Sequence, residues 1–320
     1  MTDKIFSIIC PVLNEERHIE GIISSFINNC PQPSELFIAD AGSTDRTREI
    51  VLKWSKDYPA IFLIDNPKKY VSFAFNTCYG KSSGKYLALL GAHTIYSDSF
   101  FKQALSYFET AECDAVGGPL VQTANTNTGK SIAYCMSTKF GVGGTEFRTS
   151  VAKQYVDSVA FAFYRREVFE KIGLMDEQLI RNQDDEFHYR MNAAGLRILM
   201  VPEMQCVYYV RETLSGLFKQ YFQYGLFKPL VLKKVKAGIR ARHLIPACFV
   251  LYLLTLFPAI FFIGWLALIP MILYVIFDVY FSFKANLSLQ LKIKACTVFP
   301  VLHISYGTGF LLGLKKLVNE

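Results

Sequence analysis

Two polar motifs follow the first two apolar segments of this 320-residue chain. Residues 11–15 (PVLNE) come directly after the apolar run 5–10, and a polar turn there can contact a base and a ribose, although an ordinary turn explains it equally well. Residues 40–45 (DAGSTD) begin with Asp40, whose carboxylate can accept a hydrogen bond from a base N–H. Helix capping is an equally good explanation for the last two residues of that motif. Each motif fits a nucleotide site without being specific to one.

Two further motifs carry groups for metal binding and proton transfer. Residues 90–93 (LGAH) end in His93. A lone histidine at a strand end is usually a satisfied polar group, but we expect this one to point into the crevice of a sheet. Residues 181–190 (RNQDDEFHYR) place three acids at a predicted helix start, where they complement the helix dipole, and Glu186 and Arg190 have the spacing of an ion pair. The adjacent carboxylates also repel one another, which would suit one of them to act as a general base.

An alternation of apolar runs and amphipathic stretches must position these motifs. It predicts a doubly wound, mostly parallel α/β sheet, in which ligands bind at the carboxyl ends of the strands. We expect strands at 5–10, 36–39, 61–64 and 86–90, with helices over 19–27, from 44 or 45 to 54, and from 73 to 78.

The C-terminal third has a different composition. Residues 1–212 hold 22 Lys and Arg against 25 Asp and Glu, a net −3, whereas residues 213–320 have 12 basic residues and two acids, a net +10. Leu244 to Phe277 is a run of 34 residues without a formal charge, too long for one span of about 20 residues. The alternative is a very apolar soluble helical domain. We expect a catalytic domain over 1–212, a basic amphipathic segment over 213–243, a membrane hairpin at about 244–263 and 265–283, and a third apolar helix at about 295–314.

Charge and cysteine patterns indicate the compartment. Basic residues flank the predicted hairpin, so the positive-inside rule places both flanks and the N-terminal domain in the cytosol, on a multi-pass protein of the cell (inner) membrane. No long apolar region precedes the first strand, so we expect no secretion signal. The eight cysteines show no C-x-x-C pair and are expected to be reduced and mostly buried.

Taken in order, the four motifs resemble the family 2 glycosyltransferases of the GT-A fold over roughly residues 5–210. The residues that carry the resemblance are PVLNEE, ADAGSTDRT, FAFN and NQDDEFHYR. The stretches GAHT, FGVGG, FYRREVFEKIG and QYFQYGLFK look more narrowly like the membrane-associated subgroup of succinoglycan-biosynthesis type.

The resemblance implies roles for individual residues. Asp184 matches the catalytic base, and Gln183 and Asp185 flank it on the acidic helix. Arg148, next to Phe147 after the glycine loop 141–144, would lie near the acceptor. The nucleotide-sugar pocket would be lined by Pro11, Asn14, Glu15, Asp40, Asn76, Gly91 and Ala92.

One position departs from the family pattern. The family's metal-binding Asp-x-Asp is here Gly91-Ala92-His93, so His93 would be the one protein ligand of a divalent cation. Imidazole is a better ligand for Mn²⁺ than for Mg²⁺, which favours Mn²⁺. Metal affinity should then be weak, or the metal dispensable. No organic cofactor is expected.

The resulting hypothesis is an inverting glycosyltransferase for polysaccharide or glycoconjugate biosynthesis. Its donor would be a nucleotide-diphosphate sugar (a UDP-sugar is favoured), its acceptor a lipid-linked saccharide, and its other partner the membrane lipids, with no nucleic acid. One alternative is a polyprenyl-phosphate glycosyltransferase, whose acceptor is the lipid phosphate itself. Another is a catalytically silent membrane scaffold that retains the fold, prompted by Gly91.

Overall fold

The computed structural model describes residues 4–235 and 240–319. These residues form two compact units, the first comprising residues up to 121 and 150–208, the second 122–149 and 209 onward. Residues 122–149 therefore group with the C-terminal helices, whereas the sequence placed them in one continuous domain over 1–212. The division of the chain into catalytic, juxtamembrane and membrane parts stays a prediction.

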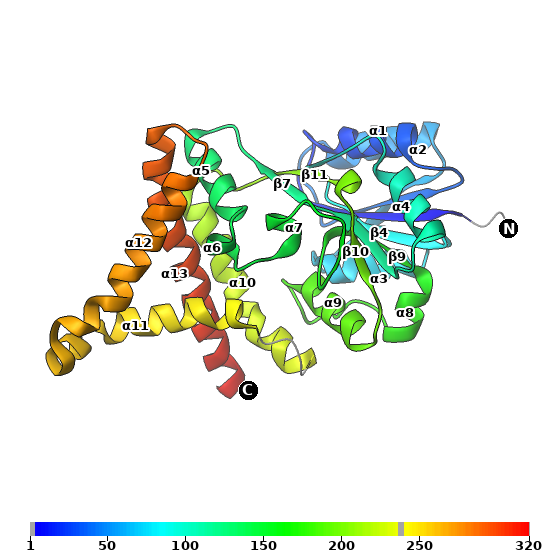
Figure 1. Cartoon of the computed structure of the whole chain (residues 1–320). Coiled ribbons are helices and arrows are strands. Elements are labelled where there is room, and N and C mark those ends of the chain that lie inside the picture. Colours follow the sequence, from blue (N-terminus) through cyan, green and yellow to red (C-terminus); the bar gives the residue numbers. More distant parts are fainter. Residues whose placement is uncertain (1–3, 236–239, 320) are drawn as a thin grey trace. The chain divides into compact units, whose positions relative to one another are not determined.

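The first unit contains an eight-stranded sheet in the order β3-β2-β1-β4-β9-β6-β10-β8. Helices α1, α2 and α4 cover one face, and α3, α8 and α9 cover the other (Figure 1). Its strands are β1 (Phe6–Val12), β2 (Glu35–Asp40), β3 (Ile61–Asp65), β4 (Tyr86–Leu89), β6 (Ala115–Gly118), β8 (Gln154–Val156), β9 (Ala160–Arg165) and β10 (Ile198–Met200). Its helices are α1 (Ile19–Asn29), α2 (Thr47–Asp57), α3 (Val71–Tyr79), α4 (Phe100–Thr110), α8 (Arg166–Ile172), α9 (Gln183–Ala193) and η1 (Pro202–Met204).

The pairing of the strands confirms the predicted α/β class. β1 pairs in parallel with β2 and β4, β2 with β3, and β6 with β10. β9 runs antiparallel between β4 and β6, and β8 is an antiparallel edge strand. All four predicted strands are present. Because β2, β1 and β4 are neighbours and parallel, the loops after them share one edge of the sheet.

A second sheet has three strands in the order β5-β11-β7: Thr94–Tyr96, Cys206–Tyr209 and Leu120–Thr123. The eight cysteines are free thiols, six of them buried, as predicted. The apolar core of this unit includes side chains of β1 and β9. Phe6 packs edge-on against Phe163, and both are fully buried.

The second unit is helical. Its members are α5 (Asn127–Met136), α6 (Lys139–Val142), α7 (Glu146–Thr149), α10 (Leu214–Val235), α11 (Ala241–Ile263), η2 (Gly264–Leu268), α12 (Ile269–Lys284) and α13 (Leu289–Asn319). Glycines let α10 and α13 approach closely. A Cβ at Gly225 would lie 2.1 Å from the carbonyl oxygen of Tyr306, and one at Gly309 would lie 2.1 Å from that of Phe222.

Helices α5 and α6 are tied to the long C-terminal helices, which explains the grouping of residues 122–149. Ser131 Oγ donates to the carbonyl oxygen of Leu291 (2.9 Å), and Tyr134 donates to that of Phe281 (2.5 Å). His303 Nε2 lies 2.8 Å from the carbonyl oxygen of Phe140. These side-chain bonds join segments far apart in sequence, so no local sequence pattern predicts them.

Two helical segments, Ala241–Lys284 and Leu289–Leu317, are long and apolar enough to cross a membrane. The predicted turn at Gly264 is present, with φ +63°, but residues 264–268 form the short helix η2, so the second leg is shorter than 265–283. The predicted third helix, 295–314, is extended at both ends in α13. In the basic segment 213–243, α10 accounts for 214–235, and residues 236–239 lie outside the described residues.

Candidate functional site

The loops after β1 and β2 are joined by reciprocal hydrogen bonds. Asn14, in the left-handed region at φ +55°, donates its N–H to Ser43 Oγ (2.9 Å), and its Oδ1 accepts from the N–H of Thr44 (2.8 Å). The N–H of Glu15 donates to Thr47 Oγ1 (2.8 Å). Pro11 is inside β1, next to this junction. The first two motifs therefore form one rigid polar surface at the carboxyl edge of the sheet.

Asp40 organises the turn after β2. Its side chain is fully buried, and it accepts from the N–H groups of Gly42 and Ser43, from Ser43 Oγ (2.5 Å) and from Arg48 Nη1 (2.7 Å). Burial alone would raise the pKa of Asp40, but the hydrogen bonds from Ser43 and Arg48 outweigh it and hold the pKa below its usual value. Asp40 is thus a charged anchor for the turn, and its bonds go to Gly42, Ser43 and Arg48.

Sequence reasoning missed Arg48. Its guanidinium also contacts Asp65 Oδ1 (2.8 Å) at the end of β3, so it links the carboxyl ends of two strands. The signal that could have identified it is a basic residue in the first turn of the helix that follows an acidic strand end. Neither Thr44 nor Asp45 is the N-cap of α2, which is Arg46 and makes no side-chain cap bond. Asp45 Oδ1 does accept from the N–H of Thr47 (3.0 Å), the first residue of α2.

His93 contacts Glu15 across the edge of the sheet (3.1 Å from Nδ1 to Oε1). The second oxygen of the same carboxylate lies 2.9 Å from Nδ1 of His18, which sequence reasoning did not identify. Partial burial would raise the pKa of Glu15, but its hydrogen bonds with His93 and then His18 leave that pKa below the usual value. Glu15 is therefore an ionised carboxylate that orients two imidazoles, and His93 remains about half exposed.

Gly91 lies where a side chain would be tight against its surroundings. Its N–H donates to Tyr96 Oη (2.8 Å), and the same hydroxyl donates to its carbonyl oxygen (3.1 Å). A Cβ at position 91 would lie 3.1 Å from the ring of Phe161 and 3.3 Å from Thr94 Oγ1. Phe161 itself is held at φ +51°, an uncommon conformation for a bulky residue. Ala92, which follows, is buried. A side chain at position 91 would therefore press against the ring of Phe161.

The donor set for a divalent cation is small. Within residues 4–235 and 240–319, no group of three histidine, cysteine, aspartate or glutamate side chains is arranged to hold a metal ion. His93 has one ring nitrogen committed to Glu15 and the opposite one available for a ligand. These residues fit a cation that shares an imidazole with the oxygens of a bound diphosphate, and they do not fit a site built by the protein alone.

The acidic motif begins α9, as predicted. Gln183 is its first residue, Asp184 is exposed and Asp185 is half-buried. Asp184 is close enough to the buried Tyr164 of β9 to contribute to raising the pKa of its phenol, an effect dominated by burial. Asn182, just before the helix, has φ +59°. An exposed carboxylate on the first turn of a helix is accessible to an acceptor hydroxyl.

Buried polar contacts fix the orientation of α9. His188, one turn after Asp184, lies between Ser158 Oγ (3.0 Å from Nδ1) and Tyr164 Oη (2.9 Å from Nε2). Burial lowers the pKa of His188 to about 4, so the ring is neutral at neutral pH. The predicted pair is also present, since Arg190 binds both oxygens of Glu186 (2.6 and 2.9 Å). Sequence reasoning identified the pair but not the buried histidine.

Two predicted residues make other contacts. The amide of Asn76 bonds to both backbone groups of Met175 (2.9 and 3.1 Å) and to Glu177 (3.0 Å), so it holds that loop, and a nucleotide contact would require these bonds to break. Arg148 is on α7 in the second unit, with its guanidinium over the ring of Phe147 (5.2 Å). Nearby, Arg242 donates to the carbonyl oxygen of Gly144 (3.3 Å), which ties the glycine loop to the start of α11.

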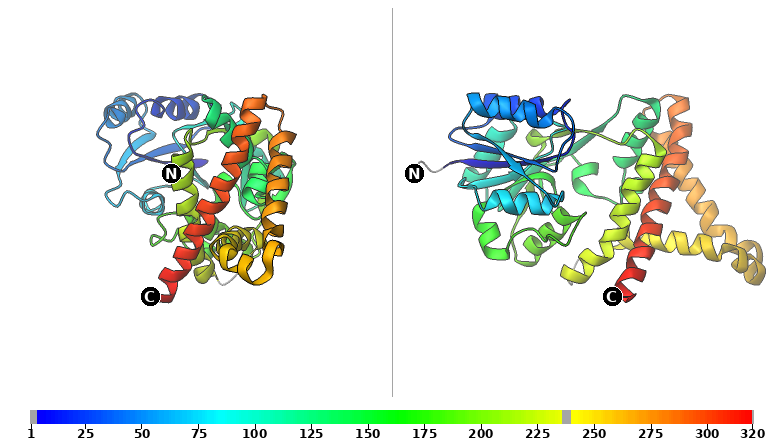
Figure 2. Two further views of the ribbon diagram at one scale, coloured as in Figure 1. Left: turned by 90° about the vertical axis from the view of Figure 1, so that its left-hand side faces the viewer. Right: turned by 180° about the vertical axis from the view of Figure 1, so that it is seen from behind.

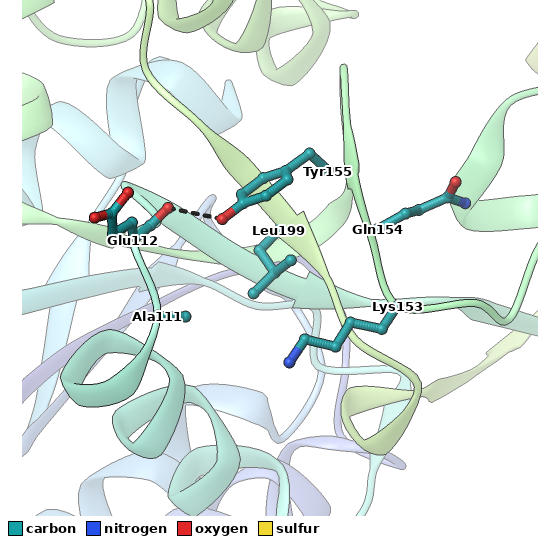
Figure 3. A pocket seen from close by; sticks show the side chains of 6 residues that line it. All are labelled: Ala111, Glu112, Lys153, Gln154, Tyr155 and Leu199. Carbon is teal, nitrogen blue, oxygen red and sulfur yellow. Dashed lines mark hydrogen bonds between the residues drawn. The ribbon is translucent and has the colours of Figure 1, made fainter.

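A shallow hollow of about 480 Å³ lies beside the edge strand β8, away from these groups (Figure 3). Tyr155 crosses it and donates to the carbonyl oxygen of Glu112 (3.1 Å). None of the residues discussed above lines it. Its lining residues are Ala111, Glu112, Lys153, Gln154, Tyr155 and Leu199.

Comparison with known proteins agrees with this geometry. The family model described as glycosyl transferase family 2 matches residues 7–173, which include β1, β2, β4 and β9. The chain belongs to glycosyltransferase family 2. It is 32% identical over 249 residues to the succinoglycan biosynthesis protein ExoA of Rhizobium meliloti (strain 1021), covering 77% of this chain and 76% of that protein. The chain is therefore a glycosyltransferase of polysaccharide or glycoconjugate biosynthesis.

Two further relatives extend the comparison. Dolichyl N-acetyl-alpha-D-glucosaminyl phosphate 3-beta-D-2,3-diacetamido-2,3-dideoxy-beta-D-glucuronosyltransferase of Methanococcus voltae is 25% identical over 241 residues, 72% of this chain and 75% of that protein. The mannosyltransferase PcManGT of Pyrobaculum calidifontis, solved with GDP-Man and Mn²⁺, aligns with a TM-score of 0.62 at 15% identity. That alignment covers 99% of this chain and 88% of that one. The glycosyltransferase thus has the GT-A fold that its motifs implied.

Proposed function

We propose that this glycosyltransferase moves a sugar, with inversion, from a nucleoside-diphosphate sugar to a lipid-linked saccharide at the cytosolic face of the cell membrane. The observation that carries the proposal is the polar surface at the joined ends of β1, β2 and β4, in the same unit as the exposed Asp184. Supporting it, a relative with 25% identity is named for action on a dolichyl-linked sugar phosphate, and the mannosyltransferase was solved with a GDP-sugar.

The nucleotide would lie over the loops after β1 and β2. Because the hydrogen bonds of the Asp40 carboxylate go to the turn itself and to Arg48, we assign Asp40 to shaping the turn at Gly42 and Ser43. The base would lie over this turn, together with Pro11 and Asn14. Arg48 covers Asp40 and is 39% exposed, so direct contact between that carboxylate and a base N–H requires the guanidinium to move. A UDP-sugar is the donor we favour.

The diphosphate would lie beside His93 and the backbone of Gly91 and Ala92. Glu15 holds the imidazole of His93 by Nδ1, which leaves Nε2 for a divalent cation shared with the diphosphate. A bound cation, for which we favour Mn²⁺, would supply positive charge to the departing phosphate oxygens. Since the protein offers so few ligands, we expect the cation to bind together with the nucleotide and weakly without it.

The proton would pass to Asp184. An acceptor hydroxyl attacks the anomeric carbon in line with the departing diphosphate, and the carboxylate of Asp184 removes the hydroxyl proton as the new glycosidic bond forms. Gln183 and Asp185 flank this carboxylate, and the buried contacts of His188 keep α9 in place. Arg148, on the segment after the glycine loop, would contact the acceptor.

Substitution of Asp184 by Asn tests the mechanism. General base catalysis contributes about 10²–10⁴-fold, so the turnover of sugar into lipid-linked product should fall by that factor. UDP binding and the thermal unfolding midpoint should be unchanged, because Asp184 is an exposed side chain. Asp185→Asn serves as the matched control, with a smaller loss. Full turnover by the Asp184 variant would refute the assignment. A product with the sugar attached directly to a lipid monophosphate would instead identify a polyprenyl-phosphate glycosyltransferase.

A further inference from the structure

Helices α11 and α12 form a hairpin with an apolar tip and basic ends. The two helices converge on η2 and separate from there (Figures 1 and 2). Arg240 and Arg242 lie at the start of α11, and Lys284 ends α12. Between Leu244 and Phe277 the chain carries no formal charge. The most exposed apolar side chains cluster toward the tip: Phe257 at 88%, Phe261 at 86%, Phe262 at 79% and Trp265 at 72%.

The lengths of the legs limit how deep the tip can reach. Leu244–Ile263 rises about 30 Å along its axis, but α12 has only 16 residues and rises about 24 Å. The hydrocarbon core of a bilayer is about 30 Å thick. Because both legs share the tip, the shorter leg sets its greatest depth. Even an upright α12 therefore leaves η2 short of the far headgroups, and the inclination between the legs reduces the depth further.

Asp278 shortens the lipid-compatible part of α12 still more. It is buried, and Ser282 Oγ donates to its Oδ1 (3.3 Å), so a polar pair lies within two turns of Lys284. The charge-free part of α12, Ile269–Phe277, rises only about 14 Å. One leaflet contributes about 15 Å of hydrocarbon, half of the full core. The apolar part of the shorter leg thus matches a single leaflet.

Several backbone groups at the tip are hydrogen-bonded within the hairpin, as hydrocarbon favours. Tyr252, from the middle of α11, donates its hydroxyl to the carbonyl oxygen of Ala267 (2.8 Å) in η2. The N–H of Gly264 donates to the carbonyl oxygen of Ile260, and that of Ile269 donates to the carbonyl oxygen of Leu266. Pro270, the second residue of α12, has no N–H to satisfy. An unsatisfied backbone group in lipid costs several kcal/mol, whereas a tip in water needs no such contacts.

From these observations we propose that the hairpin 241–284 enters one leaflet and returns to the same face, with η2 inside the hydrocarbon, and does not form two spans. Its partner is the acyl-chain region of one leaflet, with lipid headgroups around Arg240, Arg242 and Lys284. This inference rests on the membrane association in the proposed function and is independent of sugar transfer. The hairpin is then a wedge that holds the enzyme against the cytosolic leaflet.

The two tryptophans of the chain allow a direct test, since Trp265 is at the tip and Trp54 is on α2. The full-length Trp54→Phe protein is reconstituted into phospholipid vesicles whose acyl chains carry bromine near the headgroup, at mid-chain or near the chain end. We expect the loss of Trp265 emission to be greatest with bromine near the chain end. Iodide added on either side of the bilayer should not quench it.

A control and a variant complete the design. In a Trp54→Phe/Trp265→Phe background, Phe283→Trp places the probe beside Lys284, where bromine near the headgroup should quench most. Tyr252→Phe leaves the Ala267 carbonyl without its donor in lipid, so the tip should move toward the headgroups and the quenching depth should become shallower.

Three outcomes would overturn the inference. Shallow quenching of Trp265 with access to iodide from the face opposite to position 283 would show two spans. Shallow quenching with access from the same face would show a hairpin lying on the surface. If bromine at none of the three positions quenches Trp265, the tip is packed against another copy of the chain. Flotation of the protein with the vesicles, measured separately, tests membrane association itself.

Discussion

The Nδ1 atom of His93 lies 3.1 Å from Oε1 of Glu15, which joins the loop after β4 to the loop after β1. The other oxygen of that carboxylate contacts His18, so one charged group orients two imidazoles. Gly91-Ala92-His93 stands where the family resemblance implies a metal-binding Asp-x-Asp, and we propose that the contact with Glu15 orients His93 for that role.

The first prediction concerns metal dependence. His93→Ala should raise the Mn²⁺ concentration needed for half-maximal sugar transfer by about tenfold or more, because loss of even a hydrogen-bonding partner of a metal ligand typically costs 10–100-fold in metal affinity, and His93 would be the ligand itself. Glu15→Gln should have a smaller effect in the same direction, since it retains a weaker hydrogen bond to His93. His18→Asn is the matched control and should change little. Identical Mn²⁺ titrations for the His93 variant and the native enzyme would show that this histidine is not a ligand.

The second prediction concerns the turn after β2. Asp40→Asn replaces a carboxylate that accepts four hydrogen bonds with an amide. The donor NH2 of that amide would face other donors, the N–H of Ser43 or the guanidinium of Arg48. Hydrogen bonds to charged groups contribute about 1.5–3 kcal/mol, so UDP affinity measured by calorimetry should fall roughly 10- to 100-fold. Asp65→Asn removes the other, exposed partner of Arg48 and should have little effect. Equal losses in the two variants would contradict the role of the turn.

The third prediction explains why the family aspartate is absent at position 91. Gly91→Asp should lower stability and activity, because its Cβ would lie 3.1 Å from the ring of Phe161 and 3.3 Å from Thr94 Oγ1. Adding Phe161→Leu removes the obstructing ring atoms and should recover part of the unfolding temperature measured by thermal denaturation. If Gly91→Asp alone is as stable as the native enzyme, the steric explanation fails.

The sequence predicts the strands and their functional ends because each buried strand is an apolar run that stops at a polar turn, as in 5–10 and 36–39. It also predicts the ion pair of Glu186 and Arg190, whose i,i+4 spacing is local. Contacts between distant segments leave no such pattern. Ser131 reaches Leu291 across 160 positions, so the assignment of 122–149 to the helical unit required the structure. The contacts of Asp40 with its own turn and with Arg48, and the short length of α12, likewise depend on packing.

The last prediction uses the neutral His188. Its pKa in the folded enzyme is about 4, below the ordinary 6.5, so between these pH values the unfolded chain binds a proton that the folded chain does not. Stability is therefore lost as pH falls from 6.5 toward 4, by on the order of 3 kcal/mol from this group. Urea unfolding followed by Trp54 fluorescence, in the Trp265→Phe protein, measures this directly for the first unit.

His188→Gln should be less stable at neutral pH, because it loses the hydrogen bonds that His188 makes with Ser158 and Tyr164. Its stability should nevertheless decline less as the pH falls from 6.5 toward 4. His18→Gln, at an exposed position, should keep the native slope. If the unfolding free energy falls equally steeply with pH in the His188 variant and its parent, other groups carry the acid sensitivity. The neutral form of the His188 ring would then not be what holds α9 in place.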